Sequence, residues 1–378
     1  MGTQFLDGFV ANLSKKFSGN KVAVGVDVGT KSVKTVVLKK EGGKIILKNY
    51  SIARTEELLI KIGQTGVIND FTGSVVKGVL EEAGIKERQI NVAIPSFTSL
   101  IITIEVPHIN GKEFERAIRR EVSKYIPVKI EDVVYDWQII DESQLSGVGA
   151  EEKNDTGQIT TKKAGGMVKI LVIAIMKEIS RRYDEVFSAN KLAINLLEID
   201  SISLTRALTH NKVGVYLILD IGHETTNILI ASQQGVLMNR TIDIGGDRMT
   251  QVIADSMRID FKRAEQIKRE QGVNVAVTGQ SGGVLTTVLS IITEEVKKTI
   301  QLFKADFGDA EINKILLSGG SASMIGLREL IQQQSKVETF VGNALEGIVF
   351  VPEIKNVLLQ NAPSLTIAIG LALANFEE

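Results

Sequence analysis

The chain has 378 residues, 44% of them hydrophobic and 24% charged, which is typical of a folded protein long enough for two domains. Its 44 basic and 45 acidic residues leave a net charge of -1, so nothing favours nucleic acid as the main partner. The absence of cysteine excludes disulfides, thiolate catalysis and cysteine metal sites in this chain, and His108, His210 and His223 lack the spacing of metal ligands on one helix.

The first 20 residues lack the cationic start and apolar core of a secretory signal. Apolar side chains nevertheless recur at helical spacing, from Phe5 and Phe9 to Leu13 and Phe17. Two interpretations stay open. The helix either packs on the body of the protein or, helped by its neighbouring lysines, contacts a membrane or a partner.

Residues 22–97 predict an α/β unit. Two strands lie in "VAVGVDVGTKSVKTVVL" (Val22–Leu38), and a third follows at Lys44–Arg54. A helix over Phe71–Ile85 and a strand over Gln89–Pro95 complete a mixed sheet that helices flank.

Residues 98–177 predict a small subdomain inserted into this first unit. The pattern indicates a strand at Ser99–Pro107, a helix over 111–127, and strands at Val133–Ile140 and Met167–Lys177. The polar run 141–166 between the last two strands contains no aromatic residue, so we expect a flexible loop there.

The second half repeats the opening pattern. A helix, a strand and a helix fill residues 178–210, and then "VGVYLILDIGHETTNILI" again ends a strand at an aspartate. Asp27 and Asp220 lie 193 positions apart (220 minus 27), about half the chain. This internal repeat predicts two similar domains.

Both aspartates open a turn that is suited to a phosphate. The turns are Asp27-Val28-Gly29-Thr30 and Asp220-Ile221-Gly222-His223. Glycine lets backbone N–H groups approach an anion. Additional donors follow at Lys31, Ser32, Thr225 and Thr226. The two carboxylates would suit a hydrated Mg²⁺. Either turn alone could be an ordinary hairpin, but two at matching places strengthen the functional interpretation.

A third motif, "ILLSGGSASMIGLREL" (Ile315–Leu330), reads as a strand, a double glycine and a helix. Gly319 and Gly320 permit close backbone approach, and the helix that follows suits an anion or a ribose edge. No Walker motif and no G-x-G-x-x-G occurs, which disfavours P-loop and Rossmann sites.

Together these motifs resemble the superfamily of actin, sugar kinases and heat-shock chaperones, in which ATP lies between two duplicated domains. Within it the chain is similar to the PilM family of type IV pilus assembly proteins, which belongs to the FtsA-like branch. The supporting stretches are "VGVDVGTKSVKTVVL", "EFERAIRREVSKYIP" followed by "YDWQII", "LDIGHETTNILI", "IGGDRMT" and "SLTIAIGLAL". The resemblance runs from about Lys21 to the end and implies an actin-like (ribonuclease H-like) duplicated two-domain α/β fold.

The resemblance also implies roles for individual residues. Asp27, Gly29, Thr30, Lys31 and Ser32 match the first phosphate loop, and Asp220, Gly222, His223 and Thr225 match the second. Gly245 and Gly246 match the double glycine that precedes the outer part of the second domain, and both are implied to line the nucleotide site. Glu265 and Lys268 match the residues that contact the ribose and purine, and the implied adenosine motif is Gly319, Gly320, Ser321 and Met324. Glu265 and Lys268 could instead form a solvated ion pair on one helix face. His223 departs from the small residue that is commoner there.

Asp200 is the one catalytic candidate, because it resembles the position that orients water in actin-like ATPases. A helix-capping aspartate before Ser201 is the alternative. Nothing marks a strong general base, so we expect slow or undetectable hydrolysis.

The implied domain limits are as follows. An N-terminal segment covers 1–20, the first actin-like domain 21–97 with 178–212, and the inserted subdomain 98–177. The second domain covers 213–363, and a C-terminal helix over 364–378 returns to the first domain.

The implied function is an ATP-binding, Mg²⁺-dependent scaffold in the cytoplasm at the inner face of the cytoplasmic membrane. Its expected partner is the cytoplasmic N-terminal tail of a PilN-like bitopic membrane protein, bound at the junction of the inserted subdomain and the first domain. The alternatives are a filament-forming division protein like FtsA, a small-molecule kinase of the same superfamily, and an inserted subdomain that contacts a second copy of the chain.

Overall fold

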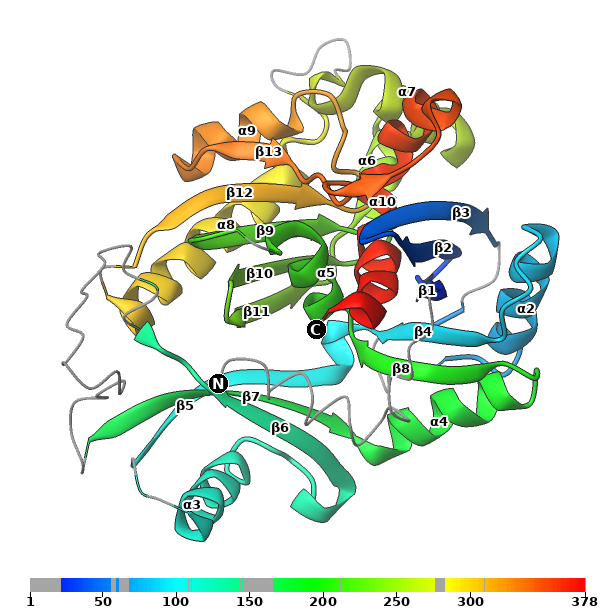
Figure 1. Cartoon of the computed structure of the whole chain (residues 1–378). Coiled ribbons are helices and arrows are strands. Elements are labelled where there is room, and N and C mark those ends of the chain that lie inside the picture. The colour runs from blue at the N-terminus through cyan, green and yellow to red at the C-terminus, as the bar shows by residue number, and fades with distance from the viewer. Residues whose placement is uncertain are drawn as a thin grey trace.

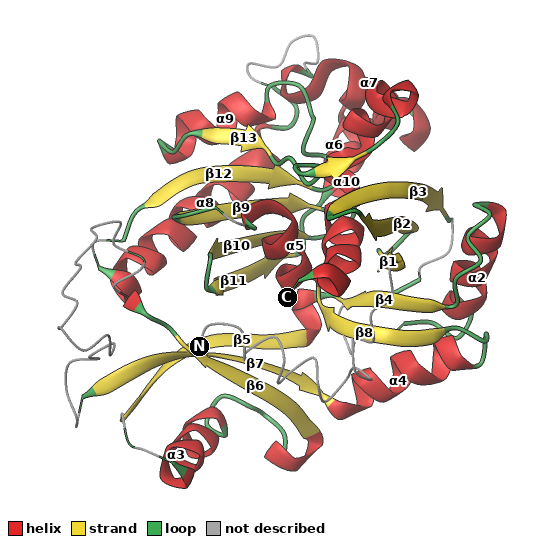
Figure 2. Cartoon of the chain, viewed as in Figure 1, coloured by secondary structure: helices red, strands yellow, loops and turns green. Residues whose placement is uncertain are grey.

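The computed structural model describes residues 22–55, 59–60, 68–107, 109, 111–142, 145, 166–210, 212–275, 283–308 and 310–377. Its strands form three sheets, of six, five and three strands, and helices lie against them (Figures 1 and 2). The predicted N-terminal helix and most of the predicted loop over 141–166 lie outside the described residues.

The first sheet has the order β14-β3-β2-β1-β4-β8. Its strands are β1 (Val22–Val28), β2 (Ser32–Glu41), β3 (Lys44–Arg54), β4 (Gln89–Ile94), β8 (Ala193–Ile199) and β14 (Ile348–Val349). The first three strands form an antiparallel meander, and β4 and β8 continue the sheet in parallel with β1. The sequence did not reveal β14, which comes from near the end of the chain and pairs with β3.

The second sheet has the order β11-β10-β9-β12-β13. Its strands are β9 (Val215–Ile221), β10 (Thr226–Ser232), β11 (Gly235–Ile242), β12 (Ile312–Ser318) and β13 (Thr339–Val341). Three antiparallel strands are again followed by two parallel ones, so the topology repeats that of the first sheet. The predicted duplicated α/β fold is confirmed.

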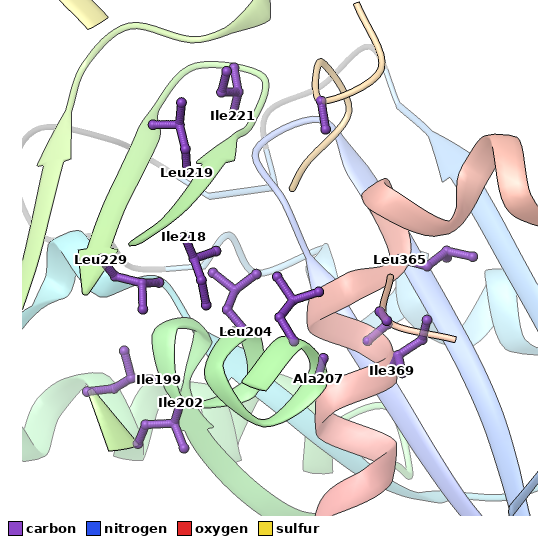
Figure 3. Close-up of a cluster of buried hydrophobic side chains, with 14 of the residues drawn as sticks. Ile199, Ile202, Leu204, Ala207, Ile218, Leu219, Ile221, Leu229, Leu365 and Ile369 are labelled. Carbon is purple, nitrogen blue, oxygen red and sulfur yellow. The ribbon is translucent and has the colours of Figure 1, made fainter. Parts of the chain in front are cut away.

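Two largely buried helices lie between these sheets. They are α5 (Asp200–Thr209) and α10 (Lys355–Leu373), which contact each other; α5 also contacts β9, β10 and β11, and α10 contacts β1, β2 and β4. Figure 3 shows Leu204 and Ala207 of α5 between Ile218 of β9 and Leu365 and Ile369 of α10. The core therefore runs continuously from one sheet to the other.

The remaining helices of the two large units lie outside this layer. They are α2 (Thr72–Glu82), α4 (Lys177–Ser188), α6 (Gly246–Met257), α7 (Phe261–Gln271), α8 (Thr286–Phe307) and α9 (Leu327–Ser335). The first two pack on each other, as do α6 with α7 and α8 with α9.

The third sheet, β5-β7-β6, comes from the predicted insertion. Its elements are β5 (Ser99–Pro107), α3 (Lys112–Val122), β6 (Val133–Ile139) and β7 (Met167–Met176). A small separate core joins the helix to the sheet, in which Phe114 meets Trp137 edge to face at 5.3 Å. The helix ends at Val122, earlier than expected. The exact domain limits at 97, 177, 212 and 363 stay predictions.

The C-terminal helix begins earlier than the sequence indicated. We expected it from residue 364, but α10 starts at Lys355 and continues through Pro363. Proline cannot donate a helix hydrogen bond, which favours a start after it. In the structure the Pro363 carbonyl oxygen accepts a hydrogen bond from the Gly319 N–H at 2.8 Å, which ties the helix to the end of β12.

Among the described residues one helical stretch, Pro352–Phe376, is long and apolar enough to cross a bilayer. Because 61% of its most apolar window is buried inside the protein, it serves here as a core helix.

Two glycines let α10 approach its neighbours. A Cβ on Gly25 of β1 would clash with the Ala368 carbonyl oxygen, and a Cβ on Gly370 would clash with the Ser203 carbonyl oxygen of α5. The backbone contacts that hold the helix layer together therefore depend on the missing side chains.

We predict opposite outcomes for one substitution at two helical glycines. Gly370→Ala should lower the free energy of unfolding by about 1–3 kcal/mol, because the added methyl group overpacks the α5 contact. The matched control, Gly78→Ala in α2, has nothing within 4 Å of the new Cβ and should stabilise by up to about 1 kcal/mol through helix propensity. Urea denaturation followed by circular dichroism measures both. Equal effects would show that the α5–α10 contact is not tight.

Candidate functional site: two matching turns over buried carboxylates

The two predicted turns have the same backbone geometry. In the turn between β1 and β2, the Gly29 N–H donates to the Ser32 carbonyl oxygen at 2.8 Å. In the turn between β9 and β10, the Gly222 N–H donates to the Thr225 carbonyl oxygen at 2.9 Å. The turns lie close enough for the charge of Lys31 to add to the effect of burial, and both lower the pKa of His223 in the opposite turn.

The strands leading into these turns end in buried carboxylates. Asp27 and Asp220 are 5% and 8% exposed, and Asp200, the first residue of α5, is 7% exposed. One lysine reaches this cluster. Lys34 Nζ lies 2.7 Å from Asp27 Oδ2. Burial would lower the pKa of Lys34, but attraction to Asp27 and then to Asp220 outweighs it and raises that pKa.

The cluster holds more negative charge than one lysine compensates. Burial raises the pKa of Asp220 to about 6, although a hydrogen bond from Ser318 and the charge of Lys34 act in the opposite direction. Burial raises the pKa of Asp200 to about 7, against a hydrogen bond from Ser96. The charges of Asp220 and Asp27 add to this rise, and Asn227, the cross-strand neighbour of Asp220, donates a hydrogen bond to Asp200.

Both oxygens of Asp200 already have partners. The Ser96 hydroxyl donates to Oδ1, and the Asn227 side-chain amide donates to Oδ2 at 3.3 Å. Asn227 accepts in turn from the Thr241 hydroxyl at 2.7 Å. The N-cap position of α5 is Ile199 and has no side-chain cap, so the helix-capping alternative for Asp200 is wrong.

Two polar atoms of the turns are buried without a hydrogen-bond partner among the described residues. They are Thr30 Oγ1 and His223 Nε2. The latter lies 3.5 Å from Asp247 Oδ1, and burial lowers the pKa of His223, which favours the neutral imidazole. Buried polar atoms without a partner are costly, so both suit a ligand between the turns.

A second group of predicted residues forms a cradle behind the β9–β10 turn. The Gly246 N–H donates to the Gly222 carbonyl oxygen at 2.9 Å, and Lys268 Nζ donates to the Gly246 carbonyl oxygen at 2.8 Å. A Cβ on Gly246 would lie 2.8 Å from Ser321 Oγ and 3.3 Å from Lys268 Nζ. The missing side chain thus keeps this space open.

Glu265 and Lys268 form an ion pair at 2.7 Å, but Lys268 is buried and the pair is not a solvated one. Burial would raise the pKa of Glu265, yet Lys268 together with hydrogen bonds from Thr250 and Arg269 lowers it to about 2. The pair therefore fixes one wall of the cradle.

The other predicted glycines have distinct structural roles. A Cβ on Gly245 would clash with the His223 carbonyl oxygen, and Gly319 has a φ of +89° and lies against Ile221. Gly320 is different, because its Cβ would meet nothing within 4 Å. Ser321 and Met324 follow in one turn, in which the Met324 N–H donates to the Ser321 carbonyl oxygen at 3.0 Å.

Sequence reasoning missed Lys34, Ser96, Asn227 and Ser318. Lys34 and Asn227 had a usable signal, since each pairs across its hairpin with the aspartate seven positions earlier. Ser96 and Ser318 reach the cluster through long-range contacts that no spacing reveals. The described residues contain no group of three or more Asp, Glu or His side chains able to hold a metal, so the Mg²⁺ prediction depends on Asp27 and Asp220 alone.

The repeated sheets and paired turns define an actin-like two-domain protein, and comparison with known proteins gives the family. A model of the family "Type IV pilus assembly protein PilM" matches residues 25–376. The chain belongs to this family of type IV pilus assembly proteins.

Two solved structures illustrate the fold. The PilM-PilN type IV pilus biogenesis complex has a TM-score of 0.76 at 24% identity, and the match covers 94% of this chain and 99% of that one. The ethanolamine utilization protein EutJ from Carboxydothermus hydrogenoformans has a TM-score of 0.53 at 16% identity, covering 98% and 97%.

Among curated proteins the chain is similar to cell division protein FtsA. The Enterococcus faecalis protein (strain ATCC 700802 / V583) is 21% identical over 355 residues, 85% of this chain and 78% of that protein. The Streptococcus pneumoniae protein (serotype 2, strain D39 / NCTC 7466) is 22% identical over 365 residues, 82% and 72%. The predicted FtsA-like branch of the superfamily is confirmed.

Asp200→Asn should raise stability in a pH-dependent manner. The pKa of Asp200 is about 7 in the folded state and about 3.9 in the unfolded state, so between these values the folded protein keeps a proton on Asp200 that the unfolded chain releases. The free energy of unfolding of the wild type therefore falls as pH rises from about 4 to 7. Above pH 7 the variant should be more stable than the wild type by a few kcal/mol, roughly 2–4. The difference should shrink toward pH 5 in chemical denaturation. The same difference at pH 5 and pH 8 would show that Asp200 is ionised normally.

Proposed function

We propose that the chain is an ATP-binding scaffold of the type IV pilus inner-membrane platform. The observation that supports this most is the pair of matching turns over three buried carboxylates, of which only Asp27 forms an ion pair with Lys34 among the described residues. Buried charge without compensation is typical of a site that a charged ligand completes.

The turns would hold the phosphates. Thr30 Oγ1 has no partner among the described residues, and the Lys31 charge lies close to both turns. The backbone N–H groups around Gly29 and Gly222 add donors suited to phosphate oxygens. The residues present therefore fit a polyphosphate.

The cradle would hold the adenosine. Gly246, Ser321 and Lys268 surround the space behind the second turn, and Gly320 opens beside it. Glu265, fixed by three donors and ionised, would accept hydrogen bonds from a ribose.

Mg²⁺ would neutralise phosphate charge and the carboxylates together. Burial raises the pKa of Asp220, so a nearby cation would stabilise its ionised form. Asp27 already pairs with Lys34. A hydrated ion held by one or two carboxylates and the phosphates fits this pair.

Hydrolysis should be slow. Asp200 is the predicted water-orienting group, but Ser96 and Asn227 occupy both its oxygens. Slow hydrolysis would leave the nucleotide bound for long periods, which suits a scaffold. A kinase would also need a general base that removes the proton of the acceptor hydroxyl group.

Gly320→Val should weaken Mg-ATP binding at least tenfold without lowering the unfolding midpoint. The new side chain meets no protein atom at its Cβ, so any loss of affinity reports a ligand in that space. Gly78→Val, equally open but on α2, is the matched control. Calorimetry with Mg-ATP measures both. Wild-type protein that binds neither ATP nor ADP would refute the proposed nucleotide site.

The proposed partner is the cytoplasmic N-terminal tail of a PilN-like membrane protein. A PilM-PilN complex has the same fold, and the inserted subdomain offers a junction that the nucleotide site does not use. There Phe97, Ile101 and Val134 are only partly buried against the main core. Such a junction suits a short apolar peptide. Binding of this peptide would keep the chain at the inner face of the membrane.

The alternative is an FtsA-like role in cell division. Complementation tests in pilus mutants and in division mutants separate the two functions.

Ile101→Lys should weaken binding of a synthetic PilN-like tail at least tenfold, because a lysine would bring charge into an apolar junction. Val349→Lys in β14 places the same side chain at an exposed apolar position outside the inserted subdomain and should leave affinity unchanged. Fluorescence anisotropy of the labelled tail measures both, with the unfolding midpoints as a folding check. Equal affinity for the two variants would place the tail elsewhere.

A further inference from the structure

The outward face of α3 is a ridge of cations. Phe114, Ile118 and Val122 turn to the small core of the inserted subdomain. On the opposite face Lys112, Arg116 and Arg120 are spaced four residues apart, so they lie one above another along the helix. All three are exposed. We call these three residues the α3 ridge.

The ridge residues form no ion pair among the described residues, although the exposed Glu113 and Glu115 lie on the same helix. Nearby, Arg119 pairs with Glu131 at 2.5 Å and Lys124 with Glu121 at 2.6 Å. Three adjacent unpaired cations repel one another, so the ridge favours an external anion.

The position of α3 fits a flat surface. The helix lies at the margin of the molecule, on the side of the third sheet that faces away from the two larger sheets (Figures 1 and 2). Arginine clusters bind acidic peptide motifs as well as lipid headgroups, and exposed apolar residues beside the ridge favour a bilayer. Just beyond the helix end, Tyr125 is 50% and Val128 40% exposed. Tyrosine with apolar and basic neighbours is typical of a membrane interface.

We propose that the α3 ridge binds anionic phospholipid headgroups. Each cation held near an anionic bilayer strengthens association roughly fivefold, so three give roughly 100-fold. Contact of this strength is weak and reversible, and stable attachment takes a second signal. The inference extends the proposed function, because a PilN-like tail held at the same subdomain would supply that second attachment.

Vesicle co-sedimentation of the full chain tests this without a PilN-like tail or nucleotide. Millimolar lipid and low salt, where the Debye length is about 30 Å, make weak binding measurable. The wild type should sediment with vesicles of phosphatidylglycerol and phosphatidylcholine and not with phosphatidylcholine alone. The triple variant Lys112→Gln, Arg116→Gln, Arg120→Gln should bind roughly 100-fold more weakly.

A second triple variant controls for net charge. Lys262→Gln, Lys298→Gln and Lys304→Gln remove three exposed lysines from the second half of the chain and should retain wild-type binding. Residues 1–20 are the same in both variants, so any contribution from them cancels. Equal losses in both triples, no loss in the α3 triple, or no binding to anionic vesicles would overturn the proposal. The proposal would also be overturned if the wild type bound soluble polyglutamate through the α3 ridge but did not bind vesicles. That result would show that the ridge recognises an acidic protein. Tail binding in solution is measured separately, so either proposal can fail without the other.

Discussion

The close packing of α10 against β1 and α5 determines how the two halves of the protein meet. Gly25 and Gly370 remove the side chains that would keep these backbones apart. Two largely buried helices therefore fill the space between the sheets, and the core passes through them without interruption. β1 contacts α10 and β9 contacts α5, and the aspartates next to the ends of these strands, Asp27 and Asp220, both attract Lys34 and raise its pKa against the effect of burial. The site is a consequence of helix packing as much as of the turns themselves.

The lack of positive charge around the carboxylate cluster is local, as a comparison of the two ends of α5 shows. Further along this helix Arg206 is equally buried, but Glu198 meets it in two hydrogen bonds of 2.5 and 3.0 Å, and Glu377 meets its Nε at 2.7 Å. The buried charge of Arg206, which has a structural role, is therefore neutralised by carboxylates of the protein itself. At the start of the same helix Asp200 has no cationic partner among the described residues, and Lys34 pairs with Asp27 instead. Burial raises the pKa of Asp200 and of Asp220. A bound cation would relieve this unfavourable burial of negative charge.

Sequence periodicity predicted the elements better than their long-range partners. The strands of both meanders follow directly from apolar runs and short turns, and the spacing of 193 positions relates both Asp27 to Asp220 and Lys34 to Asn227. Local spacing cannot show that Ser318 pairs with Asp220, or that β14 crosses to the first sheet, because these contacts join segments far apart in the chain. The start of α10 was missed for a different reason. Tertiary contacts to the Pro363 carbonyl oxygen stabilise a helix that local propensity would end there.

The inserted subdomain contacts both halves of the protein, although the chain enters it from the first half and returns to that half. Its root is next to Ser96, whose hydroxyl reaches Asp200 in the carboxylate cluster. At its other end the Gln234 side chain of the second half exchanges two hydrogen bonds with the Asp141 backbone, at 2.8 and 2.9 Å. Lys169 of β7 also lies 5.0 Å from the ring of Phe307 at the end of α8. A ligand that moves the two halves relative to each other must therefore strain or shift this subdomain. If a partner of the subdomain prefers one arrangement of the halves, linkage requires that a ligand at the turns favour or oppose that partner by the same free energy.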